Sequence, residues 1–512
     1  MSRSMNPMRS RPFTLRNIPR AGRVLSRAEA TALATKLLGM VSDRSVGVLI
    51  EHAALDLTTI ANNKIVGSDD GDELTISFDS KFGSGLPVTI GTNQLDEAML
   101  RRVIEEAKGI ETPLPLAEDA EPDDPDDPKY HTYDKREYLP VSLWHDTTIS
   151  AMDSVRGEVA PQLVEQVKKA NLIGAATVGL TARSSLYMYQ PGLTAWSQET
   201  DCELTMTART PDGTASGWAG QANRDWSKID PAAVAAAAID LANRGKNPVA
   251  IEPGHRTAIL APAAVAQIVR LMAPMFDAYQ TDHNHTPFSL RSMTGKTNKL
   301  GLHVFDPRLL MVSDPADPEG GFPPFFEANT SGGIAGLPLP KMTWVEGGIL
   351  KNLAYEWWYG LAKGKDWCEQ PFSVRLGPMA GTTTSTIEEM IAACKDGIYV
   401  SRFSDVSIVD RKTGVMTGMT RDGCFHIKAG KIDRPANNYR FTESPFFVFN
   451  KLKMIGVPQR AAFGYTPPQP SDFDNFGAWP PPGRATRWPL APTIVPPMMI
   501  EDFSFTALAD AV

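Results

Sequence analysis

The sequence predicts an α+β fold, with duplicated N-terminal α/β units built on antiparallel sheets and a β-rich C-terminal domain. Strand-like and helix-like segments come in mixed runs rather than in strict alternation. A strand–strand–helix pattern occurs twice in the first half, and short strands separated by Gly/Pro turns follow residue 300. The 512 residues exceed what one core usually holds, so we expect more than one domain.

Composition and charge exclude several classes of protein. Apolar residues make up 42% of the chain, which is enough to build cores and excludes a wholly disordered protein. The net charge of −8 argues against a nucleic-acid-binding protein, and the absence of any run of 18 apolar residues predicts no membrane span. The four cysteines form neither CxxC pairs nor a disulfide framework, which favours a reducing, cytoplasmic compartment.

Composition shifts divide the chain into segments. The first 27 residues carry seven arginines and no carboxylate, so we expect residues 1–24 to be a disordered basic tail, with an organelle transit peptide as the alternative. We assign residues 25–250 to the duplicated domain, with an exposed acidic linker at about 112–130, and residues 251–465 to the C-terminal domain. We interpret residues 466–512 as a Pro-rich extension, because ten prolines between 466 and 499 disfavour regular structure.

The N-terminal elements follow from local patterns. Ser26 and Glu29 form a capping box that begins a helix. Two short strands are expected at Val46–Ile50 and Leu55–Ile60, followed by a turn at Asn62-Asn63. Apolar spacing then predicts a helix at Leu95–Lys108.

The first half contains an internal repeat. The strand-like segment Glu73–Ser77 returns as Glu203–Thr207, 130 residues later, and a glycine follows ten residues after the start of each copy. Each copy is preceded by another strand-like segment and leads into a helix, Leu95–Lys108 in the first and Pro231–Asn243 in the second. The shared order predicts duplication of a strand–strand–helix unit. A further helix is expected around Ile149–Ala170, between the two copies.

In the second half, a short strand at Ala258–Leu260 leads into a helix that begins at Pro262 and ends near Phe276. Glycines at the turns predict hairpins at 344–351 and 426–432. Two more helices are expected, at Ser385–Lys395 and Phe446–Ile455.

Most catalytic motifs are absent. None of the eight histidines is followed by glutamate, which excludes an HExxH zinc site, and no GxSxG elbow occurs. Leu290 stands where a phosphate-binding loop ending in Thr294–Thr297 would need glycine.

One weak metal candidate remains. His283 and His285 are two residues apart, so in an extended segment they face the same way, with Asp277 and Asp282 nearby. A plain solvated loop is the interpretation that we favour. The aromatic residues of one stretch could line a peptide groove or fill the core: Phe325, Phe326, Trp344, Tyr355, Trp357, Trp358 and Tyr359.

The order of these landmarks resembles the TldD/PmbA family, once called modulators of DNA gyrase and now treated as metallopeptidases. The resemblance extends from about residue 30 to residue 465 and implies a duplicated N-terminal part, a β-rich C-terminal domain and dimers that enclose a cavity. The segments that carry it are Asn62-Asn63, Leu95–Lys108, Ile259–Pro262, Val345–Asn352, Leu361–Gly364, Gly397–Val400, Thr413-Gly414, Cys424–Lys431, Asn438–Pro445 and Met454–Gly456.

In TldD-type subunits, the helix that follows the proline carries HExxxH, and a late cysteine helps to bind zinc. The corresponding segments here, Arg270–Met275 and Val457–Ala461, contain no histidine, glutamate or cysteine. The resemblance therefore implies a PmbA (TldE)-type pseudoenzyme subunit with no catalytic residue and no metal. Zinc is expected in a TldD-type partner, with which this chain forms a heterodimer that degrades unstructured peptides; a homodimer is the alternative.

Arg440, Phe441 and Glu443 lie in the late matching segment and are candidates for substrate or interface contact, with hairpin packing as the alternative. Two other functions stay open. One is an autonomous metallopeptidase with a rearranged site built from His283, His285 and a carboxylate such as Asp282. The other is a non-enzymatic peptide-binding protein.

Overall fold

The structure is a computed structural model. The expected basic tail and nearly all of the acidic linker lie outside the residues that it describes. These are 24–40, 46–80, 85–86, 88–92, 96–108, 112–113, 137–152, 154–189, 193–291, 295–327, 335–368, 370–371, 373–464 and 492–509.

The N-terminal half is an antiparallel six-stranded sheet with the order β4-β2-β1-β6-β7-β8. This order is symmetric about the β1–β6 pair, because each half is a long hairpin flanked by a third strand. The predicted duplication is confirmed, with Glu73 on β2 and Glu203 on the corresponding strand β7. The strands are β1 (Val46–Ala61), β2 (Lys64–Ser80), β4 (Val88–Thr92), β6 (Ile173–Tyr189), β7 (Leu193–Arg209) and β8 (Ser216–Asn223). Two short strands, β3 (Gly85–Leu86) and β5 (Thr112–Pro113), pair with each other outside this sheet.

The turn predicted at Asn62-Asn63 joins β1 to β2. Both asparagines have positive φ, 49° and 58°, which asparagine tolerates in tight hairpin turns. The prediction of two strands before this turn was wrong, because Val46–Ala61 is one continuous strand. It pairs with β2 on one side and with β6 on the other over most of its length. This pairing keeps the chain in a strand around His52, where the sequence pattern is irregular.

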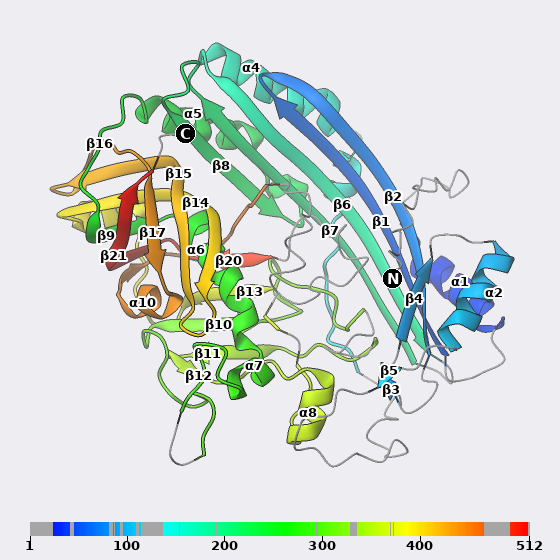
Figure 1. Cartoon of the computed structure of the whole chain (residues 1–512). Coiled ribbons are helices and arrows are strands. Elements are labelled where there is room, and N and C mark those ends of the chain that lie inside the picture. Colours follow the sequence, from blue (N-terminus) through cyan, green and yellow to red (C-terminus); the bar gives the residue numbers. More distant parts are fainter. Residues whose placement is uncertain are drawn as a thin grey trace, which may run out of the picture.

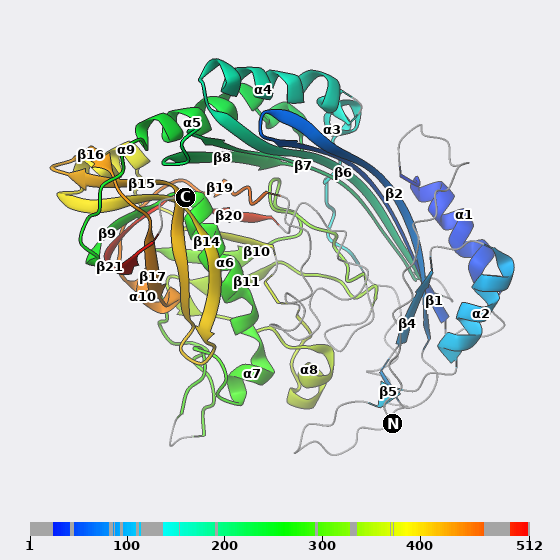
Figure 2. The same ribbon diagram turned by 45° about the horizontal axis from the view of Figure 1, so that its top comes forward.

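Figure 2 shows the sheet as an arch with helices on its outer face and the C-terminal domain beneath its inner face. Alternate residues of a strand point to opposite faces, so Val178 and Leu204 pack beneath the helices while Arg183 and Glu203 face inward. The helices are α1 (Arg27–Leu38), α2 (Glu97–Lys108), α3 (Asp146–Ala151), α4 (Ala160–Lys169) and α5 (Pro231–Arg244), with π-helical residues Val155–Val159 before α4 and a 3-10 turn at Trp226–Lys228. The Ser26–Glu29 capping box of α1 is confirmed.

The C-terminal domain contains two sheets (Figure 1). One has the order β12-β11-β10-β13-β20-β19. In the other, pairing of β14 with β15 closes the ring β14-β9-β21-β17-β15, to which β16 and β18 attach. The strands are β9 (Gly254–Leu260), β10 (Leu309–Ser313), β11 (Met342–Glu346), β12 (Ile349–Leu350), β13 (Val374–Pro378), β14 (Asp396–Asp410), β15 (Val415–Lys428), β16 (Lys431–Pro435), β17 (Tyr439–Glu443), β18 (Leu452–Ile455), β19 (Gln459–Arg460), β20 (Thr493–Val495) and β21 (Met498–Leu508).

Helix α6 (Pro262–Met272) is the centre of this domain. Its residues Val265, Ile268 and Met272 are buried in one core cluster with side chains of both sheets. It begins at Pro262 as predicted and continues as a 3-10 turn, Ala273–Phe276. The remaining helices are short: α7 (Ala278–Asp282), α8 (Trp357–Lys363), α9 (Ile387–Ala393) and α10 (Pro445–Asn450). In the part of the chain that the structure describes, no helix combines the length and the apolarity needed to cross a membrane.

Two C-terminal predictions were wrong. The helix expected at Phe446–Ile455 ends at Asn450, and the remainder is strand β18, paired with β21. Of the expected surface extension, residues 466–491 lie outside the described part of the chain; the described part supplies strands β20 and β21, whose residues from Thr493 to Ile500 are buried. The prolines flank these strands, where they remove no ladder hydrogen bond.

The contact of β8 with α5 depends on a glycine and can be tested by mutation. A Cβ atom on Gly217 would lie 2.4 Å from the carbonyl oxygen of Ala238 and 2.5 Å from the amide nitrogen of Ala242. Gly217→Ala should therefore lower the free energy of unfolding by about 1–3 kcal/mol, as measured by denaturant unfolding. Gly157→Ala is the control, because its added methyl meets no atom within 4 Å. Equal effects of the two substitutions would contradict this packing.

Candidate functional site

The inner face of β7 carries carboxylates at every second position. Glu199, Asp201 and Glu203 point toward the C-terminal domain, whereas Cys202 and Leu204, at the alternate positions, point to the helices. We call these three carboxylates the acidic row. Asp201 and Glu203 are buried, so their charges require partners.

Two arginines of the same sheet flank the acidic row. Arg183 lies opposite Glu199 on β6 and also contacts Glu327 of the C-terminal domain, with 3.2 Å between Nη2 and Oε2. Arg224, which follows β8, donates from Nη1 to Glu199 at 3.2 Å and from Nη2 to the carbonyl oxygen of Gly321. Both arginines therefore connect the sheet to the C-terminal domain.

Arg460 joins the row from β19, on the other side of the domain junction. Its Nη2 lies 2.7 Å and 2.6 Å from the two carboxylate oxygens of Asp201, and its Nη1 donates to the carbonyl oxygen of Glu319 at 3.1 Å. Both side chains of the ion pair are buried. Desolvation raises the pKa of Asp201, and the nearby Arg460 charge opposes this shift.

Glu203 holds the chain segment just beyond Arg460. Its carboxylate accepts the backbone N–H groups of Phe463 at 3.1 Å and Gly464 at 2.7 Å. Burial raises the pKa of Glu203 to about 7, even though these two hydrogen bonds and Arg460 favour the charged form. A carboxyl group with this pKa exists in both protonation states near neutral pH.

Arg270, near the end of α6, lies over the ring of Phe463, with 4.4 Å from its guanidinium carbon to the ring centroid. It is partly exposed, and burial lowers the pKa of Arg270 to about 10, so it remains charged at neutral pH. Its guanidinium makes no hydrogen bond or ion pair to any residue that the structure describes, in contrast to Arg183, Arg224 and Arg460.

Residues beside the two segments that the resemblance assigns to zinc binding lie close together. Arg270, the first residue of the earlier segment, stacks on Phe463, which follows the later segment Val457–Ala461 by two residues, and Ala263 of α6 packs in one cluster with Ala462. The side chains present there are guanidinium groups, which always carry a proton and have no lone pair for a metal. Across the described ranges, no three His, Cys, Asp or Glu side chains are placed to hold a metal ion. The donor set at this position does not fit zinc.

The other metal candidates are held apart by separate hydrogen bonds. Nδ1 of His283 lies 2.8 Å from the carbonyl oxygen of Tyr279, and Nδ1 of His285 lies 3.0 Å from Oε1 of Gln280. The carboxylate of Asp282 accepts hydrogen bonds from three side chains, those of Thr297, Asn298 and Tyr359.

Asp277 caps α7 by accepting the N–H of Gln280 at 2.7 Å. Desolvation raises the pKa of Asp277 to about 6. The alternative metal site built from His283, His285 and an aspartate is thus not assembled in this arrangement.

The three candidates on β17 differ in exposure. Phe441 is fully buried against Phe403, at 4.3 Å between ring centroids. Glu443 is also buried and accepts the N–H of Ser504 at 2.8 Å. Only Arg440 is exposed, so it alone of the three presents its side chain to a substrate or partner.

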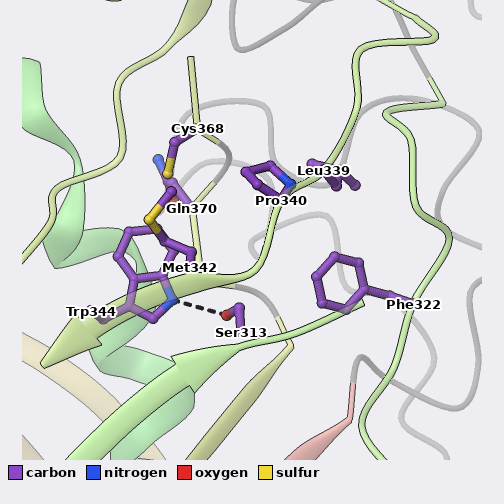
Figure 3. A pocket seen from close by; sticks show the side chains of 8 residues that line it. All are labelled: Ser313, Phe322, Leu339, Pro340, Met342, Trp344, Cys368 and Gln370. Atoms are coloured by element: carbon purple, nitrogen blue, oxygen red, sulfur yellow. Dashed lines mark hydrogen bonds between the residues drawn. The ribbon is translucent and has the colours of Figure 1, made fainter. Parts of the chain in front are cut away.

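Of the aromatic stretch, Trp344 lines a small pocket (Figure 3). The indole N–H of Trp344 donates to Oγ of Ser313 at 2.9 Å, and the space between the lining side chains is about 20 Å³, enough for about one water molecule. The lining residues are Ser313, Phe322, Leu339, Pro340, Met342, Trp344, Cys368 and Gln370. Trp344 therefore belongs to the core, as Phe325 and Phe326 do.

Sequence reasoning did not identify the acidic row or its arginines. The signal that could have found the row is the alternation of carboxylates at 199, 201 and 203 in a strand whose other residues are apolar or small. Arg460 lies in a segment with no regular pattern, and nothing in the sequence joins it to Asp201.

Comparisons with known proteins concern the family and the fold. The family model for the PmbA/TldA metallopeptidase C-terminal domain matches residues 253–507. A proposed modulator of a DNA gyrase from Thermotoga maritima shares the fold with a TM-score of 0.70, at 14% identity over 93% of this chain and 99% of that chain. TldE from Thermococcus kodakarensis gives a TM-score of 0.70, at 12% identity over 93% and 99%.

A proposed modulator of DNA gyrase from Bacteroides thetaiotaomicron gives a TM-score of 0.68, at 14% identity over 94% of this chain and 99% of that chain. At these identities the likeness shows the fold alone. No curated protein matches the sequence.

Replacing only one partner of the Arg460–Asp201 pair should lower the free energy of unfolding strongly. Arg460→Met leaves a buried carboxylate without its main partner and should lower the free energy of unfolding by about 3–5 kcal/mol. Adding Asp201→Asn should recover part of the loss, because it removes the unpaired charge. Denaturant unfolding of the two single variants and the double variant measures this coupling.

The exposed pair of Arg434 and Asp433 supplies a matched control, with 2.6 Å between Nε and Oδ2. Arg434→Met should cost less than about 1 kcal/mol. Additive effects of Arg460→Met and Asp201→Asn would show that the two buried side chains do not depend on each other.

Glu203 should make stability fall as the pH rises. Its pKa is about 7 in the folded chain and 4.5 in an ordinary environment, so the folded state binds the proton more tightly. Glu203 contributes fully to the free energy of unfolding below pH 4.5. The contribution declines between pH 4.5 and about pH 7 and is constant above that, and the total loss in the free energy of unfolding is about 3 kcal/mol at most. The measurement is the difference in free energy of unfolding between the wild type and Glu203→Gln from pH 4 to pH 8. A difference independent of pH would contradict the assignment.

Proposed function

Since this chain belongs to the PmbA/TldD family, we propose that it is a zinc-free subunit that partners a TldD-type zinc peptidase and helps to bind unstructured peptides. The observation that carries the proposal is the donor set of the two segments that the resemblance assigns to zinc binding. They offer the guanidinium groups of Arg270 and Arg460, which have no lone pair for a metal, and Arg270 lies over the ring of Phe463, three residues beyond Arg460.

The electrostatics of the junction support this proposal. A guanidinium placed beside the acidic row supplies positive charge in a dry site without a metal, and Arg460 already satisfies both carboxylate oxygens of Asp201. The two oxygens of Glu203 are likewise used by backbone N–H groups. The charge of each carboxylate is thus already balanced by a guanidinium or by backbone N–H donors, which reduces its tendency to bind a metal ion.

The peptide class of the ligand and the TldD-type partner come from the family. One structural neighbour is itself a TldE, and the shared fold is consistent with a subunit of the same type. Because the partner would supply zinc, this chain alone should neither bind zinc at stoichiometric level nor cleave peptides.

The zinc content of the purified chain tests this directly. Expressed alone and without a metal-binding tag, it should contain far less than one zinc per chain by mass spectrometry of the metal. A family member that carries HExxxH, purified in the same way, is the control and should retain zinc. A value near one per chain that is lost in His283→Ala would overturn the proposal in favour of an autonomous metallopeptidase.

Mixing experiments test the partnership. The HExxxH protein from the same source should co-purify with this chain, and the mixture should cleave an unfolded peptide faster than the HExxxH protein alone. Peptide binding by this chain with no gain in cleavage in any mixture would instead support a non-enzymatic peptide-binding protein.

A further inference from the structure

We propose that Arg270 anchors a carboxylate-binding site at the domain junction, and that its ligand is the C-terminal carboxylate of a peptide. The inference rests on the proposed function only for the peptide class of the ligand. The anionic chemistry of the site follows from the side chains themselves.

The first argument is that Arg270, which is only partly exposed, lacks a carboxylate partner. Arg183, Arg224 and Arg460 lie in the same junction, and each contacts at least one carboxylate. The guanidinium of Arg270 has no such contact within the described part of the chain, and its pKa is lowered by burial. Removing a charge from water without a counter-ion is costly, and an anion from outside would remove that cost.

The second argument is that the guanidinium is held in a fixed orientation. One face lies on the ring of Phe463, and the N–H of Phe463 is in turn held by Glu203. A guanidinium fixed on an aromatic ring keeps its edges, where the N–H donors lie, available for bonding. Such an edge matches the two oxygens of a carboxylate, and prior ordering lowers the entropic cost of binding.

The third argument concerns the nearest internal carboxylate. Glu203 is close enough that its charge partly offsets the lowering of the Arg270 pKa by burial. Each of its two oxygens, however, already accepts a backbone N–H, one from Phe463 and one from Gly464. With a pKa of about 7, it is also only partly charged near neutral pH. Glu203 therefore leaves Arg270 with positive charge that an incoming carboxylate would neutralise.

The test compares three short alanine peptides, all N-acetylated, by calorimetric titration of the full-length chain. The first has a free C-terminal carboxylate, the second a C-terminal amide, and the third an amide together with one glutamate side chain. The free-carboxylate peptide should bind about tenfold or more tightly than the amide, as expected for a charge-assisted hydrogen-bonded pair. Arg270→Gln should abolish this preference.

Arg244→Gln is the matched control. Arg244 also stacks on a phenylalanine, with 5.3 Å to the centroid of the Phe425 ring, but its Nη1 is already paired with Asp240 at 3.0 Å. The preference for the carboxylate should survive this substitution. If Arg270→Gln does not fold, Arg270→Lys keeps the charge without the forked donors and should reduce the preference, with an unchanged preference contradicting the proposal.

Several results would overturn the inference. Equal binding of the carboxylate and amide peptides, or no binding of either, would exclude the site, and a stronger effect of the glutamate peptide would exclude the C-terminal carboxylate as its ligand. Inorganic phosphate that binds at Arg270 more tightly than the peptide would make it a phosphate site. None of these outcomes changes the expected zinc content or the effect on the HExxxH partner, so the proposed function stands or falls separately.

Discussion

The ion pair between Arg460 and Asp201 is the interaction on which the relative placement of the two halves depends. It joins a central strand of the N-terminal sheet to a short strand of the C-terminal domain, with both side chains buried. A buried ion pair adds little stability relative to apolar residues of similar size, but removing one partner is expensive. The pair therefore acts chiefly on specificity, because a domain docked in any other register would leave Asp201 with only its longer contact to Arg224, 3.8 Å between Nη1 and Oδ2.

The rest of the junction follows from this pair. Once Arg460 is fixed, Phe463 and Gly464 reach the carboxylate of Glu203, and the Phe463 ring lies beneath Arg270 of the central helix. The segment also lies close to the sheet, since a Cβ atom on Gly220 would come within 2.7 Å of the Ala462 methyl carbon. Charge, backbone hydrogen bonds and close packing thus hold the segment around Arg460 and Phe463 against both the N-terminal sheet and α6.

Sequence patterns were sufficient where the relevant contacts are local. The capping box at Ser26, the proline at the start of α6 and the turn at Asn62-Asn63 each depend on a few neighbouring residues, and each was predicted correctly. The duplication was found because order along the chain survives even when identity is low.

The patterns failed where distant partners decide the structure. Asp201 and Arg460 are 259 residues apart, and no local signal connects them. Strand β21 was hidden by the prolines that precede it, although it pairs with β9, β17 and β18 in the completed sheet. Its strand character comes from these three partners, which the local sequence does not reveal.

The duplicated sheet also shows how one residue type acquires different chemistry at two corresponding positions. Glu73 and Glu203 occupy matching places in the two copies of the unit, on the same inner face of the sheet. Glu73 is exposed, and partial desolvation and the nearby Glu51 raise its pKa, whereas Glu203 is 2% exposed and burial raises its pKa to about 7. The symmetry of the repeat is therefore broken at the junction: the C-terminal domain buries the carboxylate of the second copy and brings Arg460 beside the neighbouring Asp201.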